Sequence, residues 1–305
     1  MERGALRMKG TKLQEKHIRE SLYDFVFIGP AFVIFVCFVL LPFLMSIGLS
    51  FTLWDGQSAP RWVGLQNYAI IFKGEDAFAQ YLTFTVKYAV VYVLLVNLTG
   101  LGLALILTQE RVRFRNGIRT MVILPYMVSG LVLGFIWQFI FNKVFPMAGM
   151  KMGIKALEVS WLGSSNMAYW ALILVSVWQM AGYVMFIYIA AILNIPSELV
   201  ESAKMDGGKS YQIFRYIKFP MIMPSVTVGL FYAANIAFKV FDVNFSLTGG
   251  GPANSTTSVA MDIYYEAFSR GNQGLGCAKS AIFFIVVALL TLSQLKLTQN
   301  KEVQL

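Results

Sequence analysis

Long runs of apolar residues alternate with short polar segments along most of this chain. Six runs reach the roughly 20 residues that a helix needs to cross about 30 Å of hydrocarbon. They cover residues 25–51, 83–108, 120–141, 168–193, 221–241 and 275–295. A membrane β-barrel would instead show short segments of alternating polarity. The pattern therefore predicts an all-α, polytopic membrane protein with six transmembrane helices.

The composition agrees with this prediction and narrows the chemistry. Of the 305 residues, 57% are hydrophobic and 13% are charged, whereas a typical soluble domain has about 25% charged residues. Cys37 and Cys277 lie in or beside apolar runs, and His17 is the single histidine. These residues form no disulfide framework, metal-ligand spacing or histidine-based triad. We therefore expect no catalytic residue, no metal site and no cofactor bound by this chain.

The basic residues predict the orientation of the six helices. Of the 25 lysines and arginines, 16 fall in the N-terminal tail, in 109–119, in 196–220 and in the C-terminal tail. The positive-inside rule places these segments, and hence both termini, in the cytoplasm. The chain then divides into a cytoplasmic tail (1–22), a transmembrane domain (23–295) and a second cytoplasmic tail (296–305). Because the net charge of +9 is spread between apolar spans, it does not indicate a nucleic-acid partner.

The longest polar segment in the second half of the chain is residues 196–220, and its local pattern predicts two short helices around a glycine turn. Pro196 suits a first helical turn, and Asp206-Gly207-Gly208 would break that helix. Ser210 is expected to cap the second helix, and Pro220 to end it at the membrane. These helix rules alone do not distinguish a partner-binding segment from an ordinary loop at the membrane interface.

Part of this segment is similar to a phosphate-binding loop, but the similarity fails on structural grounds. Residues 203–210 read AKMDGGKS, one glycine short of the pattern G-x-x-x-x-G-K-[ST]. A phosphate-binding loop also requires a preceding β-strand, and the residues before Ala203 have a helical pattern. We therefore predict that this chain does not bind ATP.

The same segment resembles the cytoplasmic "EAA" loop of ABC-importer permeases, which reads Glu-Ala-Ala, two residues, Asp-Gly-Ala, then Phe, Ile and a closing Leu-Pro. The matching positions are Glu201, Ser202, Ala203, Asp206, Gly207, Gly208, Phe214, Ile217, Phe219 and Pro220. Ser202, Gly208 and Phe219 depart from the pattern but conserve size or polarity. Two further stretches, 62–68 (WVGLQNY) and 241–256 (FD…LTGGGP…T), resemble external motifs of the carbohydrate-uptake branch, which includes maltose-, glycerol-phosphate- and raffinose-type importers.

This resemblance implies a fold, a set of partners and a set of coupling residues. The fold would be the type I transmembrane domain of ABC importers, in a bacterial or archaeal cytoplasmic membrane. The partners would be a second, non-identical permease, two copies of a cytoplasmic ATPase that carries ATP and Mg, and an extracytoplasmic sugar-binding protein. The residues expected to couple this chain to the ATPase are Glu201, Ser202, Ala203, Asp206, Gly207 and Gly208.

Candidates for a sugar path come from aromatic and hydrogen-bonding residues inside the spans. They are Tyr88, Tyr92, Asn97, Trp178, Gln179, Tyr183, Asn235, Lys239 and Asp242. Tyr88 and Tyr92 should share a helix face, as should Gln179 and Tyr183, and Lys239 and Asp242 could pair. Aromatic residues near span ends also form interface belts, and a lysine there reaches water at little cost. We expect Asp242 to organise the following 249–252 loop.

Three other functions compete with this interpretation. A secondary transporter driven by an ion gradient would favour carboxylates inside the spans, where the sequence places essentially none. An intramembrane enzyme would need histidines or paired aspartates in the spans. A purely structural scaffold is compatible with the composition but does not account for the matched motifs.

Overall fold

The computed structural model describes residues 27–109 and 111–299. Within this part of the chain, six helices are long and apolar enough to cross a membrane, as predicted. They are Phe27–Leu49, Phe78–Leu107, Gly130–Met152, Ser165–Leu193, Ser210–Phe238 and Gln273–Leu297. The predicted N-terminal tail and residues 300–305 lie outside the described residues.

The elements follow one another with short connections. In the first third of the chain they are η1 (Val36–Leu40, π-helical), α2 (Leu41–Leu49), β1 (Thr52–Leu53), β2 (Arg61–Trp62), α3 (Gln66–Phe72) and α4 (Phe78–Leu107). The middle third contains α5 (Arg115–Met127), α6 (Gly130–Phe139), η2 (Ile140–Val144), α7 (Phe145–Met152), α8 (Lys155–Glu158), α9 (Ser165–Leu193) and α10 (Ser197–Met205). The last third contains α11 (Ser210–Ile213), η3 (Phe214–Lys218), α12 (Phe219–Phe238), α13 (Asp242–Leu247), α14 (Val259–Tyr264), η4 (Tyr265–Ser269) and α15 (Gln273–Gln299).

The core of the bundle is formed by α4 packed against α9, with α5 and α12 beside them. Without a hydrophobic force between helices in lipid, close backbone approach through small residues is what brings such helices together. Gly100 of α4 illustrates this, because a Cβ there would lie 2.7 Å from Val184 Cγ1 of α9. On the other side of α9, Gly182 faces the backbone of Val122 in α5.

The third span differs from the predicted continuous helix over 120–141. Its helix α5 ends at Met127, Val128 and Ser129 are extended, and α6 starts at Gly130 in a new direction. Pro125 sits two residues before the end of α5, and its ring removes one backbone donor. The membrane-length apolar helix therefore runs over Gly130–Met152, as α6, η2 and α7 together.

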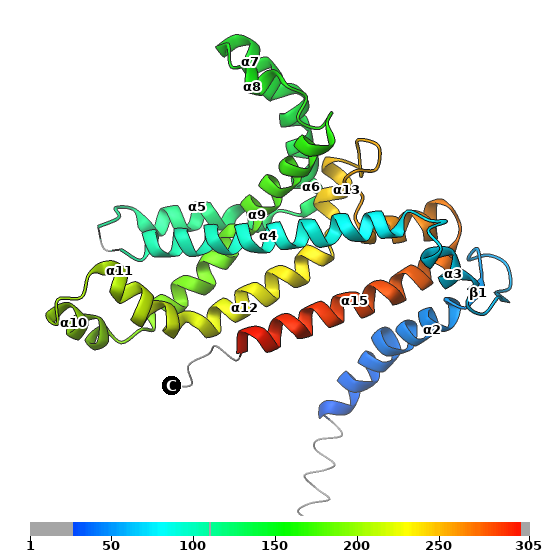
Figure 1. Ribbon diagram of the computed structural model, residues 1–305, viewed down its shortest axis with the longest axis horizontal. Coiled ribbons are helices and arrows are strands. Elements are labelled where there is room, and N and C mark those ends of the chain that lie inside the picture. Colours follow the sequence, from blue (N-terminus) through cyan, green and yellow to red (C-terminus); the bar gives the residue numbers. More distant parts are fainter. Residues whose placement is uncertain (1–26, 110, 300–305) are drawn as a thin grey trace, which may run out of the picture.

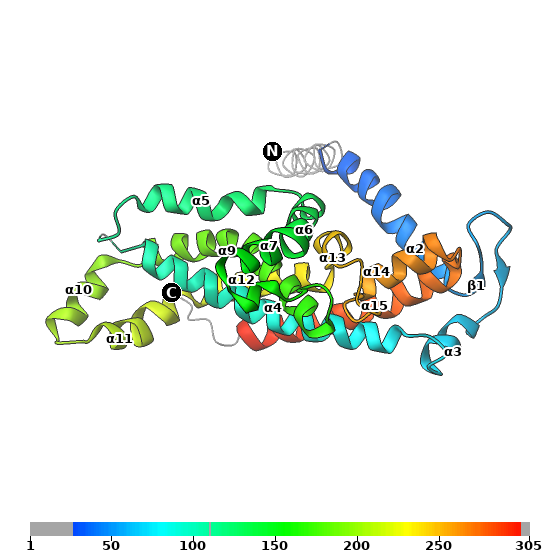
Figure 2. The same cartoon turned by 90° about the horizontal axis from the view of Figure 1, so that it is seen from above.

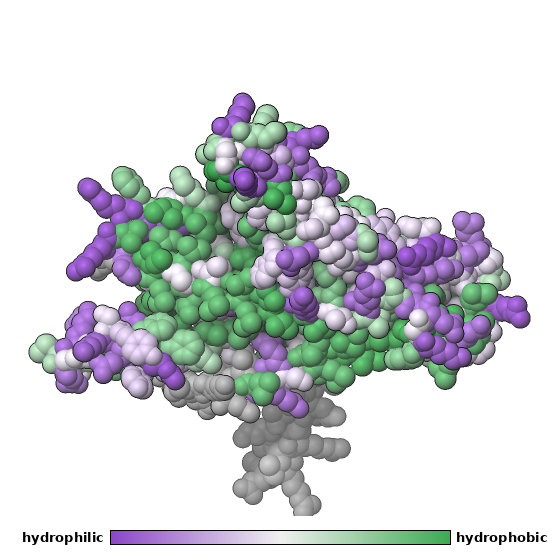
Figure 3. Space-filling view, turned by 45° about the horizontal axis from the view of Figure 1, so that its top comes forward, coloured by the Kyte–Doolittle hydropathy of each residue, from purple (hydrophilic) through white to green (hydrophobic). Residues whose placement is uncertain are grey.

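Two ends of the bundle can be distinguished in Figures 1 and 2. The α10 end carries α10 and α11, and the α3 end carries α3 and the antiparallel pair β1–β2. The pair α7–α8 projects from the bundle. On the face shown in Figure 3, apolar residues cover the middle of the molecule and polar residues gather towards its extremities. Such a distribution is expected of a protein whose middle is in contact with lipid.

Candidate functional site

The segment 196–220 contains the first short helix and the glycine turn that its sequence predicts. Helix α10 ends at Met205, and Gly207 follows with φ of +79°, a left-handed conformation that glycine adopts without steric cost. The N–H of Gly208 donates to the carbonyl of Ala203 at 2.9 Å. A Cβ on Gly208 would lie 2.6 Å from that carbonyl oxygen, so a side chain there would require the turn to shift.

Two expectations for the second helix of this segment were wrong. Ser210 is the first residue of α11 and not its cap, and the N–H of Lys209 is bonded instead to Gln212 Oε1 at 2.8 Å. Pro220 does not end the helix, because α11, η3 and α12 continue as one helix from Ser210 to Phe238. The N–H of Phe219 reaches five residues back to Phe214 in a π-helical turn, and this wider turn accommodates the proline that follows.

Helix α10 is exposed to solvent at the α10 end of the bundle. None of its nine residues is buried, and the apolar side chains of Leu199 and Met205 are 47% and 90% exposed. Glu201, Ser202, Asp206 and Gly207 are exposed, and Ala203 and Gly208 are half-buried. A short helix that shows apolar, acidic and small residues together is a suitable surface for a protein partner.

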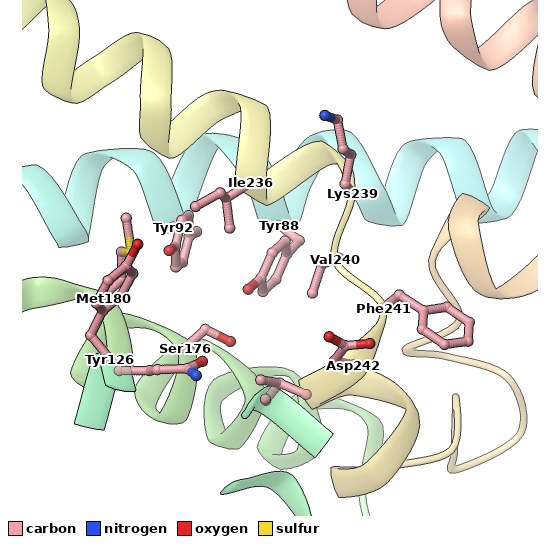
Figure 4. Close-up of a pocket in the computed structure, with 13 residues that line it drawn as sticks. Tyr88, Tyr92, Tyr126, Ser176, Met180, Ile236, Lys239, Val240, Phe241 and Asp242 are labelled. Carbon is pink, nitrogen blue, oxygen red and sulfur yellow. The ribbon is translucent and has the colours of Figure 1, made fainter. Parts of the chain in front are cut away.

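A second candidate site is a cavity of about 260 Å³ inside the bundle. It lies where α4 and α9 face the breaks between α5 and α6 and between α12 and α13 (Figure 4). Its lining residues are Tyr88, Tyr92, Tyr126, Gly130, Ser176, Gln179, Met180, Ile236, Lys239, Val240, Phe241, Asp242 and Val243. The cavity thus offers aromatic rings, hydroxyls, an amide and one carboxylate to a ligand.

Stacked tyrosines form two sides of this region. The rings of Tyr88 and Tyr92, one helical turn apart on α4, stack with centroids 5.6 Å apart, as their spacing predicts. Tyr183 stacks against Tyr126 and lies tilted against Tyr232, each with ring centroids 4.8 Å apart, and the hydroxyls of Tyr126 and Tyr232 lie 3.0 Å apart. Aromatic faces of this kind suit the C–H surfaces of a sugar, and the phenol groups suit its hydroxyls.

The break in the third span is held open by a side chain from α9. Gln179 Nε2 donates to the carbonyl of Val128 at 3.0 Å. That carbonyl would otherwise lack a partner, because Val128 is extended and the helix does not continue past it. Gln179 therefore both lines the cavity and stabilises the backbone conformation that shapes it.

The structure brings five of the nine predicted path residues together around the cavity: Tyr88, Tyr92, Gln179, Lys239 and Asp242. In Figure 4 the Asp242 carboxylate faces the opening, whereas the Lys239 ammonium points away from the tyrosines. The predicted pairing of Lys239 with Asp242 is wrong, because α12 ends at Phe238 and the two residues lie on either side of a break. No ion pair joins these two described residues.

The other four predicted residues lie outside the cavity lining. Asn97 is buried and accepts a hydrogen bond from Tyr188 Oη at 2.5 Å. Trp178 is 45% exposed and packs edge-on against Trp137. Tyr183 lies behind Tyr126, and Asn235 is half-buried on α12.

Several lining residues were missed by the sequence interpretation, among them Tyr126, Ser176, Met180 and Ile236. Ser176 lies three residues before Gln179 on α9, so helical spacing from Gln179 could have found it. Tyr126 follows Pro125, and a proline inside an apolar run marks either a kink or a break, so it gave only a weak signal for Tyr126. The positions of Met180 and Ile236 carry no comparable signal.

Residues in the stretches 62–68 and 241–256 fix the local fold of these segments. Asn67 is buried, and its Nδ2 donates to the carbonyls of Ser50 and Thr52 at 2.8 and 2.9 Å, which fixes the end of the first span. The 249–252 loop is organised by Asn244, not by Asp242 as expected. Asn244 Nδ2 donates to the Thr256 carbonyl at 2.7 Å, and Thr248 Oγ1 lies 2.9 Å from Thr256 Oγ1.

Comparisons with known proteins agree with this architecture. Residues 97–297 match the family described as "Binding-protein-dependent transport system inner membrane component". A probable starch degradation products transport system permease protein of Thermoanaerobacterium thermosulfurigenes is 40% identical, over 95% of this chain and 98% of that protein. A multiple sugar-binding transport system permease protein of Streptococcus mutans is 30% identical, over 94% and 99%. A trehalose/maltose transport system permease protein of Thermococcus litoralis is also 30% identical, over 91% and 94%.

Solved structures share the fold. A chain from a bacterial ABC transporter involved in the import of the acidic polysaccharide alginate has a TM-score of 0.81 at 21% identity, and the match covers 93% of this chain and 98% of that chain. A chain from a bacterial alginate ABC transporter, solved in complex with an alginate pentasaccharide-bound periplasmic protein, has a TM-score of 0.78 over 92% and 94%. Both likenesses concern the arrangement of the helices.

Proposed function

Because this chain belongs to the family of binding-protein-dependent transport system inner membrane components, we propose that it is the permease subunit of an ABC importer whose cargo is a sugar or oligosaccharide. The observation that carries the proposal is the tyrosine-lined cavity at the two helix breaks, in a chain whose relatives are named as carriers of starch products, several sugars, trehalose and maltose. Family membership does not favour an ion-gradient-driven carrier, and Asp242 is the one carboxylate among the lining residues.

The segment 196–220 is the proposed contact with a cytoplasmic ATPase. Exposed α10 residues and the tight glycine turn support this role for Glu201, Ser202, Ala203, Asp206, Gly207 and Gly208. Because α11, η3 and α12 form one continuous helix, movement of the loop would reach Tyr232 and Ile236 directly. In this proposal the α10 end and both termini face the cytoplasm, and the α3 end faces the extracytoplasmic binding protein.

The complete assembly contains this chain, a second non-identical permease and two copies of the ATPase, in a bacterial or archaeal cytoplasmic membrane. ATP and Mg act on the ATPase, and this chain contributes the path and the coupling surface. The path residues in the proposal are Tyr88, Tyr92, Gln179 and Asp242, with Tyr126 and Ser176 added from the cavity. We assign supporting positions around this path to Lys239, Asn97, Trp178, Tyr183 and Asn235.

The proposal is tested by purifying the tagged chain from its native host and reconstituting what is recovered with it. We expect a second permease and an ATPase to co-purify, and uptake of a labelled maltodextrin or related oligosaccharide to require both ATP and a binding protein. Uptake by this chain alone, driven by an ion gradient without ATP, would contradict the proposal. A panel of neutral and acidic oligosaccharides in the same vesicles would identify the cargo.

A further inference from the structure

A fully buried lysine at the α3 end is surrounded by three carboxylates. Lys279 lies two turns into α15, and its side chain has no exposed surface. Its Nζ lies 2.8 Å from Asp76 Oδ2, 2.8 Å from Asp262 Oδ2 and 2.8 Å from Glu266 Oε2. A lysine has three ammonium hydrogens, so each can be donated to a separate carboxylate.

A second set of donors completes the charge cluster. Arg270 Nη1 donates to Glu266 Oε2 at 2.6 Å and lies 3.4 Å from Asp262 Oδ1. Asn272 Nδ2 donates to Glu266 Oε1 at 2.8 Å. The cluster thus contains two cations and three carboxylates. Burial raises the pKa of Asp262, whereas hydrogen bonds from Lys279 and Asn272 outweigh burial and lower the pKa of Glu266.

The three carboxylates come from segments that are far apart in the sequence. Asp76 precedes α4 and also accepts a bond from the N–H of Phe78, at the start of that helix, at 2.8 Å. Asp262 lies on α14 and Glu266 on η4. Lys279 therefore joins α15 to the beginning of α4 and to the helix that follows the 249–252 loop. Apolar packing around Phe78, Tyr81 and Val259 accompanies these bonds.

The same segments lead to two sides of the cavity, here called its walls. One wall is α4, and the other is residues 240–243. Helix α4 carries Tyr88 and Tyr92 three to four turns beyond Asp76. On the other side, Ser258 Oγ, at the start of α14, donates to the carbonyl of Val240 at 2.8 Å, and Val240 lines the cavity beside Asp242. The N–H of Val259 donates to Thr85 Oγ1 of α4 at 3.0 Å. A shift of α14 away from α4 would therefore separate the two walls.

We propose that Lys279 is a positioning residue of the transporter, which holds the α4 wall and the 240–243 wall of the cavity in register through Asp76, Asp262 and Glu266. Hydrogen bonds are directional where apolar packing is not, so three bonds donated by one ammonium specify how α14 sits on α4. The cavity's role as a sugar path rests on the proposed function, whereas the mechanical link between α4 and α14 does not.

The mechanical link can be measured directly on the full-length chain in lipid nanodiscs. Cys37 and Cys277 are first replaced by serine, and spin labels are placed at two exposed positions, Thr83 on α4 and Phe268 on η4. We expect one narrow distance distribution in this parent. Asp76→Asn should broaden and lengthen it, because this change removes the charge link to α4 while Lys279 keeps Asp262 and Glu266. Lys279→Met should do so more strongly.

Lys73→Met is the matched control, because Lys73 is an exposed lysine close to the same turn. It should leave the distribution unchanged, and Lys279→Arg should restore a narrow one in part. If Lys279→Met does not fold, Asp76→Asn alone decides the question. An unchanged distribution in Asp76→Asn would overturn the proposal, whether or not the chain transports sugar.

Uptake by the complete reconstituted transporter provides the functional readout. Asp76→Asn should raise the half-saturating concentration of loaded binding protein by about fivefold or more, in keeping with the usual size of coupling between sites. The amount of assembled complex should stay the same. A fall in maximal uptake with an unchanged half-saturating concentration would indicate a purely structural role and would contradict the positioning of the cavity walls.

Discussion

The two ends of the bundle satisfy their polar groups in opposite ways. At the α3 end, Lys279 and its three carboxylates are paired with one another, and Asn67 donates to the backbone carbonyls of Ser50 and Thr52. At the α10 end, no residue of α10 is buried, and Leu199 and Met205 expose apolar surface. A surface that exposes apolar and acidic side chains is suited to binding a partner. A region whose polar groups are all hydrogen-bonded within the chain is instead suited to holding a rigid structure.

The largest expected difference between the ends concerns two glycines with nearly the same positive φ angle. Gly207 at the α10 end has φ of +79° and Gly74 at the α3 end has φ of +74°, and a Cβ at either would meet nothing within 4 Å. A side chain in this conformation costs roughly 1–2 kcal/mol. If residues 196–220 contact the ATPase as proposed, Gly207→Val should lower ATP-driven uptake by roughly tenfold or more, because it changes the conformation of that turn.

Gly74→Val is the control for that prediction. It should cause a similar loss of thermal stability with near-normal uptake per assembled complex. The measurement is uptake in proteoliposomes, normalised to the ATPase recovered with the chain. Equal losses of uptake in both variants would mean that backbone strain alone, and not contact with the ATPase, accounts for the effect at Gly207.

A second comparison exchanges one glutamate for glutamine at each end. Glu266→Gln removes a buried charge that accepts bonds from Lys279, Arg270 and Asn272, and we expect a loss of about 1.5–3 kcal/mol in stability. Glu201→Gln changes an exposed residue of α10 and should alter stability by less than about 0.5 kcal/mol. Thermal unfolding in detergent measures both. A Glu266→Gln variant as stable as the parent would show that the cluster contributes little.

Between the two ends, a pair of tyrosines separates ligand binding from packing. Tyr88 lines the cavity, whereas Tyr188 is buried and donates its hydroxyl to Asn97. If the Tyr88 hydroxyl binds the cargo, Tyr88→Phe should raise the KM for uptake about fivefold, the equivalent of one hydrogen bond of about 1 kcal/mol. Tyr188→Phe should lower thermal stability and leave KM unchanged. The reverse pattern would place the sugar path beside Tyr188 and Asn97 and not beside Tyr88.

The smallest expected effect is a pH dependence at the α3 end. The pKa of Glu266 in the folded protein is below its ordinary value of 4.5, so its contribution to stability is complete above that value and is lost as pH falls through the lower, folded pKa. Asp262, with a raised pKa, has the opposite sign and offsets part of this loss.

The measurement is the unfolding temperature of the wild type and of Glu266→Gln between about pH 5 and about pH 3. The wild type should lose more stability on acidification than the variant does. An identical decline in the two proteins would show that Glu266 is not responsible for the acid sensitivity.

Much of the fold follows from the sequence, because membrane insertion depends on the local average of hydropathy. Each predicted span lies within or overlaps an observed helix, and the turn at Gly207 is fixed by residues next to it. The break at Val128 was not predicted, since a proline inside an apolar run is compatible with either a kinked or a broken helix. Only the contact from Gln179 to the Val128 carbonyl decides between these outcomes.

The candidate cavity could be predicted only in part. Helices α4 and α9 are apolar on every side, so hydrophobic periodicity does not indicate which face is turned inward. Spacing grouped Tyr88 with Tyr92 correctly, but Trp178 and Gln179 are neighbours that point to different surroundings. The partners of Lys279 could not be predicted, because its three carboxylates lie from 13 to 203 residues away in the chain.

The sequence by itself determined that this chain has six apolar spans of membrane-crossing length and that a short exposed helix and a glycine turn follow Pro196. These properties depend on short stretches of chain and on the solvent around them. The tertiary structure decided which tyrosines share a cavity, where two spans break and which charges neutralise Lys279. Those outcomes depend on contacts between distant segments, and the local sequence contains no record of the direction in which each helix faces.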